Sequence, residues 1–517
     1  MRSQDGPVAA RSRPTNGVIN SHPDLEWRET VQGRRPGDRF VRVATHKGFT
    51  RVRQGYIVAR PGYDTPTTTL GRVAHAFKHI LLGTPIPTAR EGHERLNKLR
   101  ALAVFSSDAL SSVAYGGEEI MKVLVLAGAG ALSLTLPISI VIVVLLAIVV
   151  VSYRQTIRAY PSGGGSYIVA SDNLGMLPGL TAAAALLIDY ILTVSVSVAA
   201  GVAAITSMVP ASLPYAVPIG VAAVALIMVA NLRGIRESGT IFAAPTYVFV
   251  AMMYVLIGVG LWRLATGDFN YAPPPSVRPF AAEGLSVFLI LRAFAQGCSA
   301  MTGTEAISNG VPAFKPPEAS NARNTLVWMG VLLGSMFFGM NFVATNIGIL
   351  PASDETILSQ LGRVVFGKGP LYVLLQISTA LILVLAANTS FADFPRLASI
   401  LARDRFLPRL FQFRGDRLAF TSGILALAVL ASVLLVVFNG SVDQLIPLYA
   451  IGVFASFTLS QTGMVRYWWH RRERGWPWRL AANSVGGMTT GVVLVVVLIS
   501  KFRDGAWLVV ECLPILV

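Results

Sequence analysis

Two stretches of the sequence place carboxylates, hydroxyls and glycines inside runs that are otherwise apolar. The first reads Phe105-Ser-Ser-Asp-Ala-Leu-Ser-Ser-Val-Ala-Tyr-Gly-Gly-Glu-Glu119, and the second reads Ala295-Gln-Gly-Cys-Ser-Ala-Met-Thr-Gly-Thr-Glu-Ala-Ile-Ser-Asn-Gly310. Polar groups of this kind are costly in a lipid bilayer unless they line a cavity. Helices interrupted at corresponding places in two halves of a chain indicate a substrate site near the membrane midplane. Packing of small residues between helices is the alternative, but packing alone needs no carboxylate.

The two interrupted runs supply four candidate site residues. Asp108 and Tyr115 lie in the first run, and Thr302 and Glu305 lie in the second. Carboxylate, hydroxyl and backbone carbonyl oxygens suit a hard, weakly held cation. Because neither run contains a histidine, Asp108 and Glu305 are the candidates to carry a proton in a coupled transport cycle.

A third polar feature is Asp189, near the middle of the apolar run Leu186-Leu-Ile-Asp-Tyr-Ile-Leu-Thr-Val-Ser-Val-Ser197. Thr193 and Ser197 follow it by four and eight positions, so the three side chains lie on one face of a helix. A charge at that depth costs about 2.5–3.5 kcal/mol on insertion scales, and such residues mark pathways for ions and substrates. We therefore predict that this stripe binds a cation. A structural aspartate that hydrogen-bonds to a neighbouring helix is the alternative.

A basic residue precedes the second interruption. Arg292 needs an anionic partner, because an unpaired charge in an apolar run is costly. Glu118, Glu119 and Asp108 are the candidates, and the sequence does not choose among them.

The elements that must position these residues are membrane-spanning helices. Of the 517 residues, 53% are hydrophobic and 14% are charged, and the mean hydropathy is +0.59. A soluble domain carries about 25% charged residues, so the composition excludes a soluble globular protein. The formal charge of +16 does not indicate nucleic-acid binding, because the basic residues lie between the hydrophobic runs. The two cysteines, Cys298 and Cys512, provide neither a disulfide framework nor a metal motif.

Hydrophobic runs of about 20 residues predict the transmembrane helices. Eleven such runs lie near residues 100–127, 132–152, 178–208, 213–231, 240–263, 284–308, 326–350, 370–391, 420–438, 444–465 and 483–500. A twelfth run begins at Ala506 and ends with the sequence at Val517, so we expect the last helix to be truncated. The prediction is an all-α membrane protein of about twelve transmembrane helices.

Basic residues are distributed unevenly between the two sets of loops. If the N-terminus is cytoplasmic, the inner loops hold most of the Lys and Arg residues, as the positive-inside rule requires. We therefore predict a multi-pass protein of the cell membrane with a cytoplasmic N-terminus. Residues 1–67 are predicted to be a disordered basic segment, residues 68–97 an amphipathic surface helix or a short solvated helix, and residues 98–517 the transmembrane domain.

Enzymatic chemistry finds little support in the sequence. The loop Pro161-Ser-Gly-Gly-Gly-Ser-Tyr167 lacks the Gly-Lys-Ser/Thr ending of a phosphate-binding loop. Neither a metal-ligand cluster nor a pairing of nucleophile and base is evident in the sequence. We predict that the protein is not an enzyme and has no cofactor.

The same loop and the two interrupted helices resemble the amino acid–polyamine–organocation (APC) superfamily. Within it, the segments Ser106–Tyr115, Gly303–Gly310 and Asn388–Arg396 are similar to the KimA-type potassium importers, relatives of the KUP potassium–proton symporters. The resemblance covers about residues 85–517. It implies the LeuT-like fold, an inverted repeat of five plus five helices. It also implies a homodimer supported by a cytosolic C-terminal domain, which this sequence does not contain.

Eight residues match functional positions of that family. The resemblance implies that potassium is bound by Asp189, Thr193, Ser197, Tyr115, Thr302 and Tyr449, of which Asp189, Thr193, Ser197 and Thr302 are the direct ligands. Asp108 and Glu305 match an Asp and a Glu of that family, and we predict that they serve coupling or gating. The assignment of Tyr449 to the site depends on the resemblance, because a lone intramembrane tyrosine is more often a packing residue.

The leading hypothesis is therefore a secondary active importer of potassium ions, coupled to protons. An amino acid or polyamine permease of the same fold is the alternative, although Asp108 would repel the substrate carboxylate that amino acid permeases hold at a helix break. A membrane sensor that transports nothing is a third hypothesis. Thr389 and Ser390 either form part of a sodium site or cap their own helix. The expected partners are the lipid bilayer and a small cation, not nucleic acid.

Overall fold

The computed structural model describes most of the chain from residue 95 onward. The described ranges are 95–163, 165–233, 239–271, 283–413, 420–502 and 506–517, with residues 68, 69, 273 and 415 and four N-terminal strands. The chain forms two units, residues 1–81 and residues 82–517.

The first unit contains two antiparallel hairpins. Strand β1 (Arg28–Gln32) pairs with β2 (Arg39–Val43), and β3 (Phe49–Arg53) pairs with β4 (Tyr56–Ala59). These strands lie within the segment predicted to be disordered and differ from that expectation, because their valine, threonine and aromatic residues favour extended backbone. The amphipathic segment predicted at 68–97 lies largely outside the described residues.

The second unit is a helical membrane domain. Among the described residues, eight helical stretches are long and apolar enough to cross a membrane. They correspond to the helices α5 (Thr135–Ala159), α7 (Met176–Met208), α8 (Ala216–Leu232), α9 (Gly239–Thr266), α12 (Glu318–Ile347), α14 (Pro370–Arg403), α16 (Val442–Arg471) and α17 (Trp476–Lys501). A shorter apolar helix, α15 (Thr421–Val437), matches a further predicted run. The predicted all-α membrane protein is thereby confirmed.

The two runs predicted to be interrupted consist of short helices. The first is divided into α2 (Lys98–Phe105), α3 (Ser107–Ser111) and α4 (Val113–Leu124). The second is divided into α10 (Val287–Gly297), the 3-10 helix η5 (Cys298–Met301) and α11 (Ala306–Asn309). Between η5 and α11 the backbone of Gly303 has a φ of +75°, a conformation that glycine adopts without steric cost. The interruptions free backbone groups from helical hydrogen bonds.

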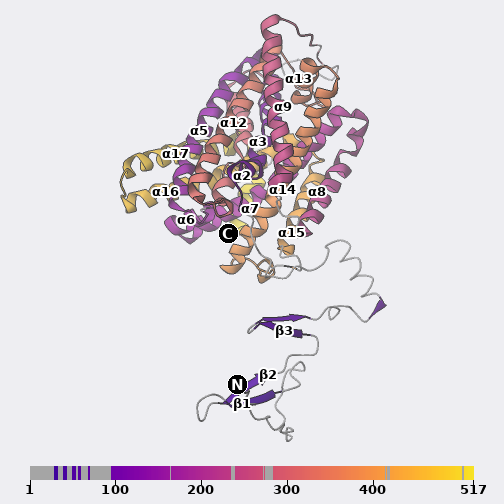
Figure 1. Cartoon of the computed structure of the whole chain (residues 1–517). Coiled ribbons are helices and arrows are strands. Elements are labelled where there is room, and N and C mark those ends of the chain that lie inside the picture. Colours follow the sequence, from indigo (N-terminus) through magenta and orange to yellow (C-terminus); the bar gives the residue numbers. More distant parts are fainter. Residues whose placement is uncertain are drawn as a thin grey trace, which may run out of the picture. The chain divides into compact units, whose positions relative to one another are not determined.

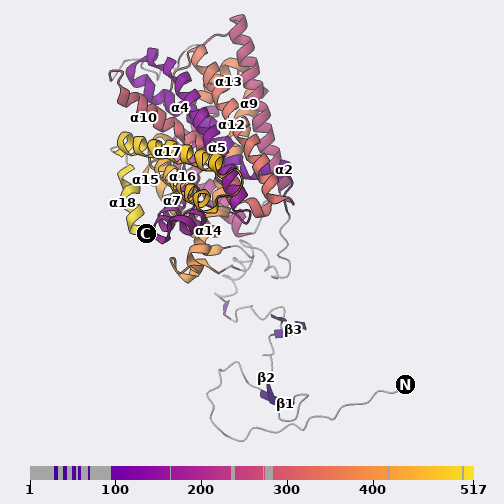
Figure 2. The same ribbon diagram turned by 90° about the vertical axis from the view of Figure 1, so that its left-hand side faces the viewer.

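Two long helices form the interior of the bundle. Within the most apolar 18-residue segment of each helix, 83% of the residues of α7 and 72% of those of α16 are buried, against 17% for α8 and 28% for α17. Their burial makes α7 and α16 the central helices, and both carry polar residues that are buried there. By contrast, α8 and α17 expose apolar residues, as helices that face lipid do. Figure 1 shows α2 and α3 among helices from later in the sequence, whereas Figure 2, turned by 90°, shows α2 near one edge of the bundle. Helix α3 packs on α14.

Shorter elements connect these helices. They are η2 (Val125–Ala127), η3 (Ala129–Leu134), α6 (Ser166–Leu174), η4 (Pro210–Tyr215), η6 (Val311–Ala313), α13 (Ile357–Phe366), η7 (Arg409–Phe411) and α18 (Ala506–Leu516).

Candidate functional site

The two interrupted helices contact each other at their breaks. The Ser112 hydroxyl donates a hydrogen bond of 2.8 Å to the carbonyl oxygen of Ala300. A Cβ atom placed on Gly303 would lie 2.6 Å from Oδ2 of Asp108, so no larger residue fits there without a shift. The absence of a side chain at Gly303 thus lets the Asp108 carboxylate lie directly against the break of the second run.

The predicted stripe on α7 faces α16. Asp189, Thr193 and Ser197 are all buried, and the Thr193 hydroxyl donates a hydrogen bond of 3.0 Å to the Tyr449 hydroxyl. A Cβ atom on Gly452 of α16 would lie 2.9 Å from the backbone oxygen of Ala185 and 3.6 Å from the backbone nitrogen of Asp189. The backbones of α7 and α16 therefore approach each other beside Asp189.

Three carboxylates share this interior. Asp108, Asp189 and Glu305 are 7%, 2% and 3% exposed, and the charge of Asp189 interacts with those of the other two. Each has one carboxylate oxygen without a hydrogen-bond partner, and none forms an ion pair with any described Lys or Arg. Unpaired buried carboxylates are strongly unfavourable. The arrangement therefore suits protonation of some of these groups, or a bound cation, or both.

Tyr115 and Thr302 join the same cluster. Both are buried, and the Tyr115 hydroxyl lies next to the Thr302 side chain and within electrostatic range of Asp108 and Asp189. The Thr302 hydroxyl donates to the carbonyl oxygen of Ser299 at 2.9 Å, which leaves its lone pairs available to a cation.

Ser197 is the predicted site residue that lies farthest from the others along α7. Eight residues of α-helix correspond to about 12 Å along the axis, so one ion does not contact Asp189 and Ser197 at the same time. The structure thus gathers seven of the eight predicted residues around the carboxylates, and it places Ser197 farther along the same helix face.

A cavity of about 500 Å³ leads from one end of the bundle to Tyr115. Its charged lining residues are Glu118, Glu119, Asp354, Glu355 and Asp443, together with Lys122. A cleft lined mostly by one sign of charge raises the local concentration of the opposite ion. Burial raises the pKa of Glu355, and this shift is opposed by the hydrogen bond from Ser359 and by Arg363, whose guanidinium lies 2.6 Å away.

The sequence analysis did not identify the role of Lys122 in this cavity, which we call the vestibule. Its ammonium lies 2.7 Å from Glu118, 3.3 Å from Glu119 and 2.7 Å from Asp443. The two glutamates considered as partners of Arg292 are therefore paired with Lys122. The signal was present in the sequence, since glutamates four and three positions before a lysine pair on one helix face.

The sequence analysis also did not identify Asp393 on α14 as a candidate site residue. Its charge acts on Asp108, Glu305 and Tyr190, which places it beside the carboxylate cluster. The Tyr190 hydroxyl in turn accepts a hydrogen bond of 3.2 Å from the amide of Asn309. Asp393 is an acidic residue inside an apolar helix, the same signal that identified Asp189.

The hydroxyls considered for a sodium site have different environments. Thr389 donates to the carbonyl oxygen of Ala386 in its own helix at 2.7 Å, whereas the buried Ser390 hydroxyl has no hydrogen-bond partner among the described residues. Among all the residues that the structure describes, no group of three or more His, Cys, Asp and Glu residues is arranged to hold a metal ion.

The chain is similar to known membrane transport proteins. Residues 96–507 match the model of a family described as amino acid permease. The chain is 48% identical over 443 residues to the potassium transporter KimA of Bacillus subtilis, covering 86% of this chain and 73% of that protein. It is 22% identical over 327 residues to the low-affinity putrescine importer PlaP of Escherichia coli K12, covering 63% of this chain and 71% of that protein.

Proposed function

The chain belongs to the amino acid permease family, and on this premise we propose that it is a secondary active importer of potassium ions driven by protons. Membership of this family makes the protein a membrane transporter and not an enzyme. The observation that carries the proposal is the cluster of Asp108, Asp189 and Glu305, buried with unpartnered oxygens and without a basic partner among the described residues. Similarity to a potassium transporter supports the choice of ion.

Potassium is assigned to the α7 stripe in this proposal. Asp189 provides the charge that compensates for dehydration of the ion, and Thr193, Thr302 and Tyr115 provide neutral oxygens beside it. Ser197 lies two helical turns away and acts at a different stage of passage along the same face.

The proton is assigned to Glu305 or Asp108. Symport requires that the proton and the potassium ion occupy different carboxylates, because a cation entering beside a protonated carboxyl favours loss of that proton. Buried carboxylates that interact with one another do not all ionise easily, which suits one of them to carry a proton while Asp189 holds the ion.

The finer architecture belongs to the same proposal. We infer an inverted repeat of five plus five helices, about twelve transmembrane helices in the complete fold, and a cytoplasmic N-terminus in the cell membrane. Its support is the pair of interrupted helices five spans apart and the basic loops at one end of the bundle. A homodimer without a resident cofactor follows from the resemblance to the potassium importers.

Import of a small organic cation is the second candidate. The similarity to a putrescine importer favours it, and buried carboxylates also bind ammonium groups. Potassium is preferred because the similarity to the potassium transporter is much higher and extends over more of the chain.

An uptake assay in proteoliposomes distinguishes the two candidates. Protein reconstituted in potassium-free vesicles is given labelled rubidium as a potassium tracer, with and without an inward proton gradient. We expect accumulation that depends on the gradient and is inhibited by potassium but not by putrescine. Inhibition by putrescine alone, with labelled putrescine entering the vesicles, would replace potassium with the organic cation. Absence of any flux would favour the membrane sensor.

A further inference from the structure

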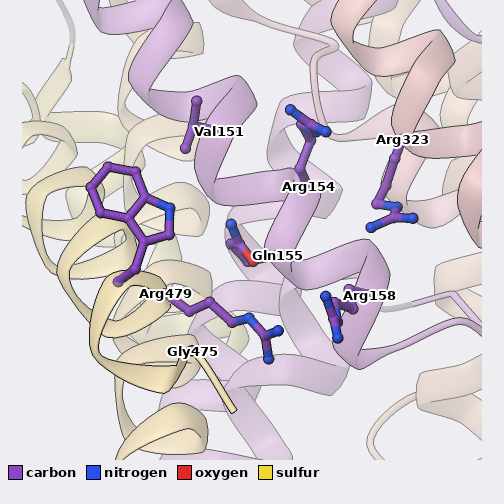
Figure 3. Close-up of a pocket in the computed structure, with 8 residues that line it drawn as sticks. Val151, Arg154, Gln155, Arg158, Arg323, Gly475 and Arg479 are labelled. Carbon is purple, nitrogen blue, oxygen red and sulfur yellow. The ribbon is translucent and has the colours of Figure 1, made fainter. Parts of the chain in front are cut away.

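A second cavity, of about 490 Å³, lies apart from the carboxylate cluster and its vestibule. Arginines from three helices line it: Arg154 and Arg158 from α5, Arg323 from α12 and Arg479 from α17. Figure 3 shows the four side chains around a common space, with Gln155 between them. These helix ends belong to the side of the bundle where the basic loops lie.

The positive charge in this cavity is not neutralised by its lining. None of the lining residues is acidic, and Arg154, Arg158 and Arg323 make no hydrogen bond or ion pair with their guanidinium groups among the described residues. The Nε of Arg323 is buried without a partner. Guanidinium groups around one space repel one another, and an anion between them relieves this repulsion.

Arg479 is the most buried of the four. It is 8% exposed, and its Nη1 has no hydrogen-bond partner in the described residues. Among the described residues, its nearest carboxylate oxygen belongs to the half-exposed Glu473, at 3.7 Å, which is beyond hydrogen-bond distance. A buried, cationic donor that faces a cavity without a close acceptor indicates that the acceptor is a ligand.

Arg479 is held in place by contacts of its side chain and of its backbone. The guanidinium lies 4.6 Å from the ring centre of Trp468, a cation–π contact. The Ser152 hydroxyl donates a hydrogen bond of 2.7 Å to the side chain of Asn483, whose amide donates to the carbonyl oxygen of Arg479 at 2.8 Å. This buried chain of bonds joins α17 to α5 and positions the backbone of Arg479 beside the cavity.

We propose that this cavity binds the phosphate of an anionic phospholipid headgroup. Guanidinium groups recognise phosphate oxygens in pairs, and several arginines around one space suit a single phosphate. The lining also contains Trp478 and Val151, both exposed on the surface of the bundle, as expected where headgroups and acyl chains meet. The site is independent of the proposed transport activity, because it shares no residue with the carboxylate cluster or the vestibule.

Lipid binding is measured by native mass spectrometry of the full chain in a neutral detergent, titrated with phosphatidylglycerol. The variants are Arg323→Gln and Arg158→Gln, with Arg323→Lys as the conservative change. Arg409→Gln is the control, because Arg409 is an exposed arginine outside the cavity. We expect one saturable lipid in the wild type and in the control, and binding at least about tenfold weaker in each glutamine variant, since hydrogen bonds to charged groups are strong. Arg323→Lys should retain part of the affinity.

Competition identifies the source of the phosphate. Inorganic phosphate is added to the same titration, and phosphatidylcholine is tested as a zwitterionic lipid. The proposal predicts that neither displaces phosphatidylglycerol at equal concentration. If inorganic phosphate displaces the lipid and itself depends on Arg323, the phosphate site stands and the lipid assignment is wrong. Equal lipid binding by all variants, or an equal loss in Arg409→Gln, would overturn the site. If a glutamine variant does not fold, the lipid affinity of Arg323→Lys provides the test of the site instead.

Discussion

The Thr193 hydroxyl on α7 donates a hydrogen bond of 3.0 Å to the Tyr449 hydroxyl on α16. Both residues are buried, and the bond joins the two central helices beside the carboxylate cluster. Because the Thr193 proton is used in this bond, its oxygen lone pairs remain available to a cation. Tyr449 therefore takes part in the site by preparing Thr193 as a ligand.

Replacing Tyr449 with phenylalanine removes the acceptor and leaves the Thr193 proton unpaired. We expect Tyr449→Phe to weaken potassium affinity about two- to tenfold, because a neutral hydrogen bond contributes about 0.5–1.5 kcal/mol. Isothermal titration calorimetry measures the Kd. Tyr254→Phe is the matched control, since its hydroxyl also bonds to a hydroxyl on another helix, Ser335 at 2.7 Å, but on the exposed side. Equal affinities of the two variants would contradict the role of Tyr449.

Asp189→Asn preserves the shape of the side chain and removes its charge. Breaking a buried charge pair costs about 3–5 kcal/mol, so we expect potassium affinity to fall at least about a hundredfold. Calorimetry on the purified, monodisperse protein checks this. Asp172→Asn makes the same chemical change at an exposed position on α6 and should bind normally. Unchanged affinity of Asp189→Asn would exclude Asp189 as a ligand.

Removing the charge of Glu305 or Asp108 tests whether the proton and the potassium ion occupy different carboxylates. Glu305→Gln and Asp108→Asn should each reduce accumulation driven by a pH gradient more than they reduce potassium exchange at equilibrium, because exchange needs no net proton transfer. Tracer uptake and tracer exchange in the same proteoliposomes give both quantities. The assignment is wrong if both variants still accumulate potassium with normal dependence on the proton gradient.

Gly452 tests the close approach of α16 to α7. A Cβ atom there meets the backbone oxygen of Ala185 at 2.9 Å, so Gly452→Ala requires a shift of one helix backbone. Such overpacking costs about 1–3 kcal/mol, and we expect a lower Tm together with weaker potassium binding. Gly258→Ala on α9 is the control, because no atom lies within 4 Å of the added Cβ. A Tm for Gly452→Ala at or above that of the control would contradict the packing.

Cysteine labelling tests the orientation. Cys298 is buried, so a Cys512→Ser background removes the exposed thiol among the native cysteines. In that background we expect Lys368→Cys to react with an impermeant maleimide in intact cells and Gln412→Cys to react only after lysis. The physical reason is the concentration of basic residues in the 392–419 loop. Reversed labelling would invert the topology.

Local chemistry made much of the fold predictable. Apolar runs, glycine breaks and the i, i+4, i+8 spacing of Asp189, Thr193 and Ser197 depend only on neighbouring residues. The spans, the two interrupted helices and the polar face of α7 could therefore be predicted from the sequence. The strands between residues 28 and 59 were not predicted, because the high content of Arg, Gly and Pro outweighed their short alternating runs.

Contacts between distant segments were decided by the tertiary structure. Lys122 meets Asp443 across 321 positions, and Arg154 shares a cavity with Arg323 and Arg479, although hydrophobic periodicity says nothing about which helix faces which. The sequence by itself determined that carboxylates enter the membrane domain and at which helical positions. Only the packing of α7 against α16, and of one break against the other, decided that they share one interior, because that depends on close approach at Gly452 and Gly303.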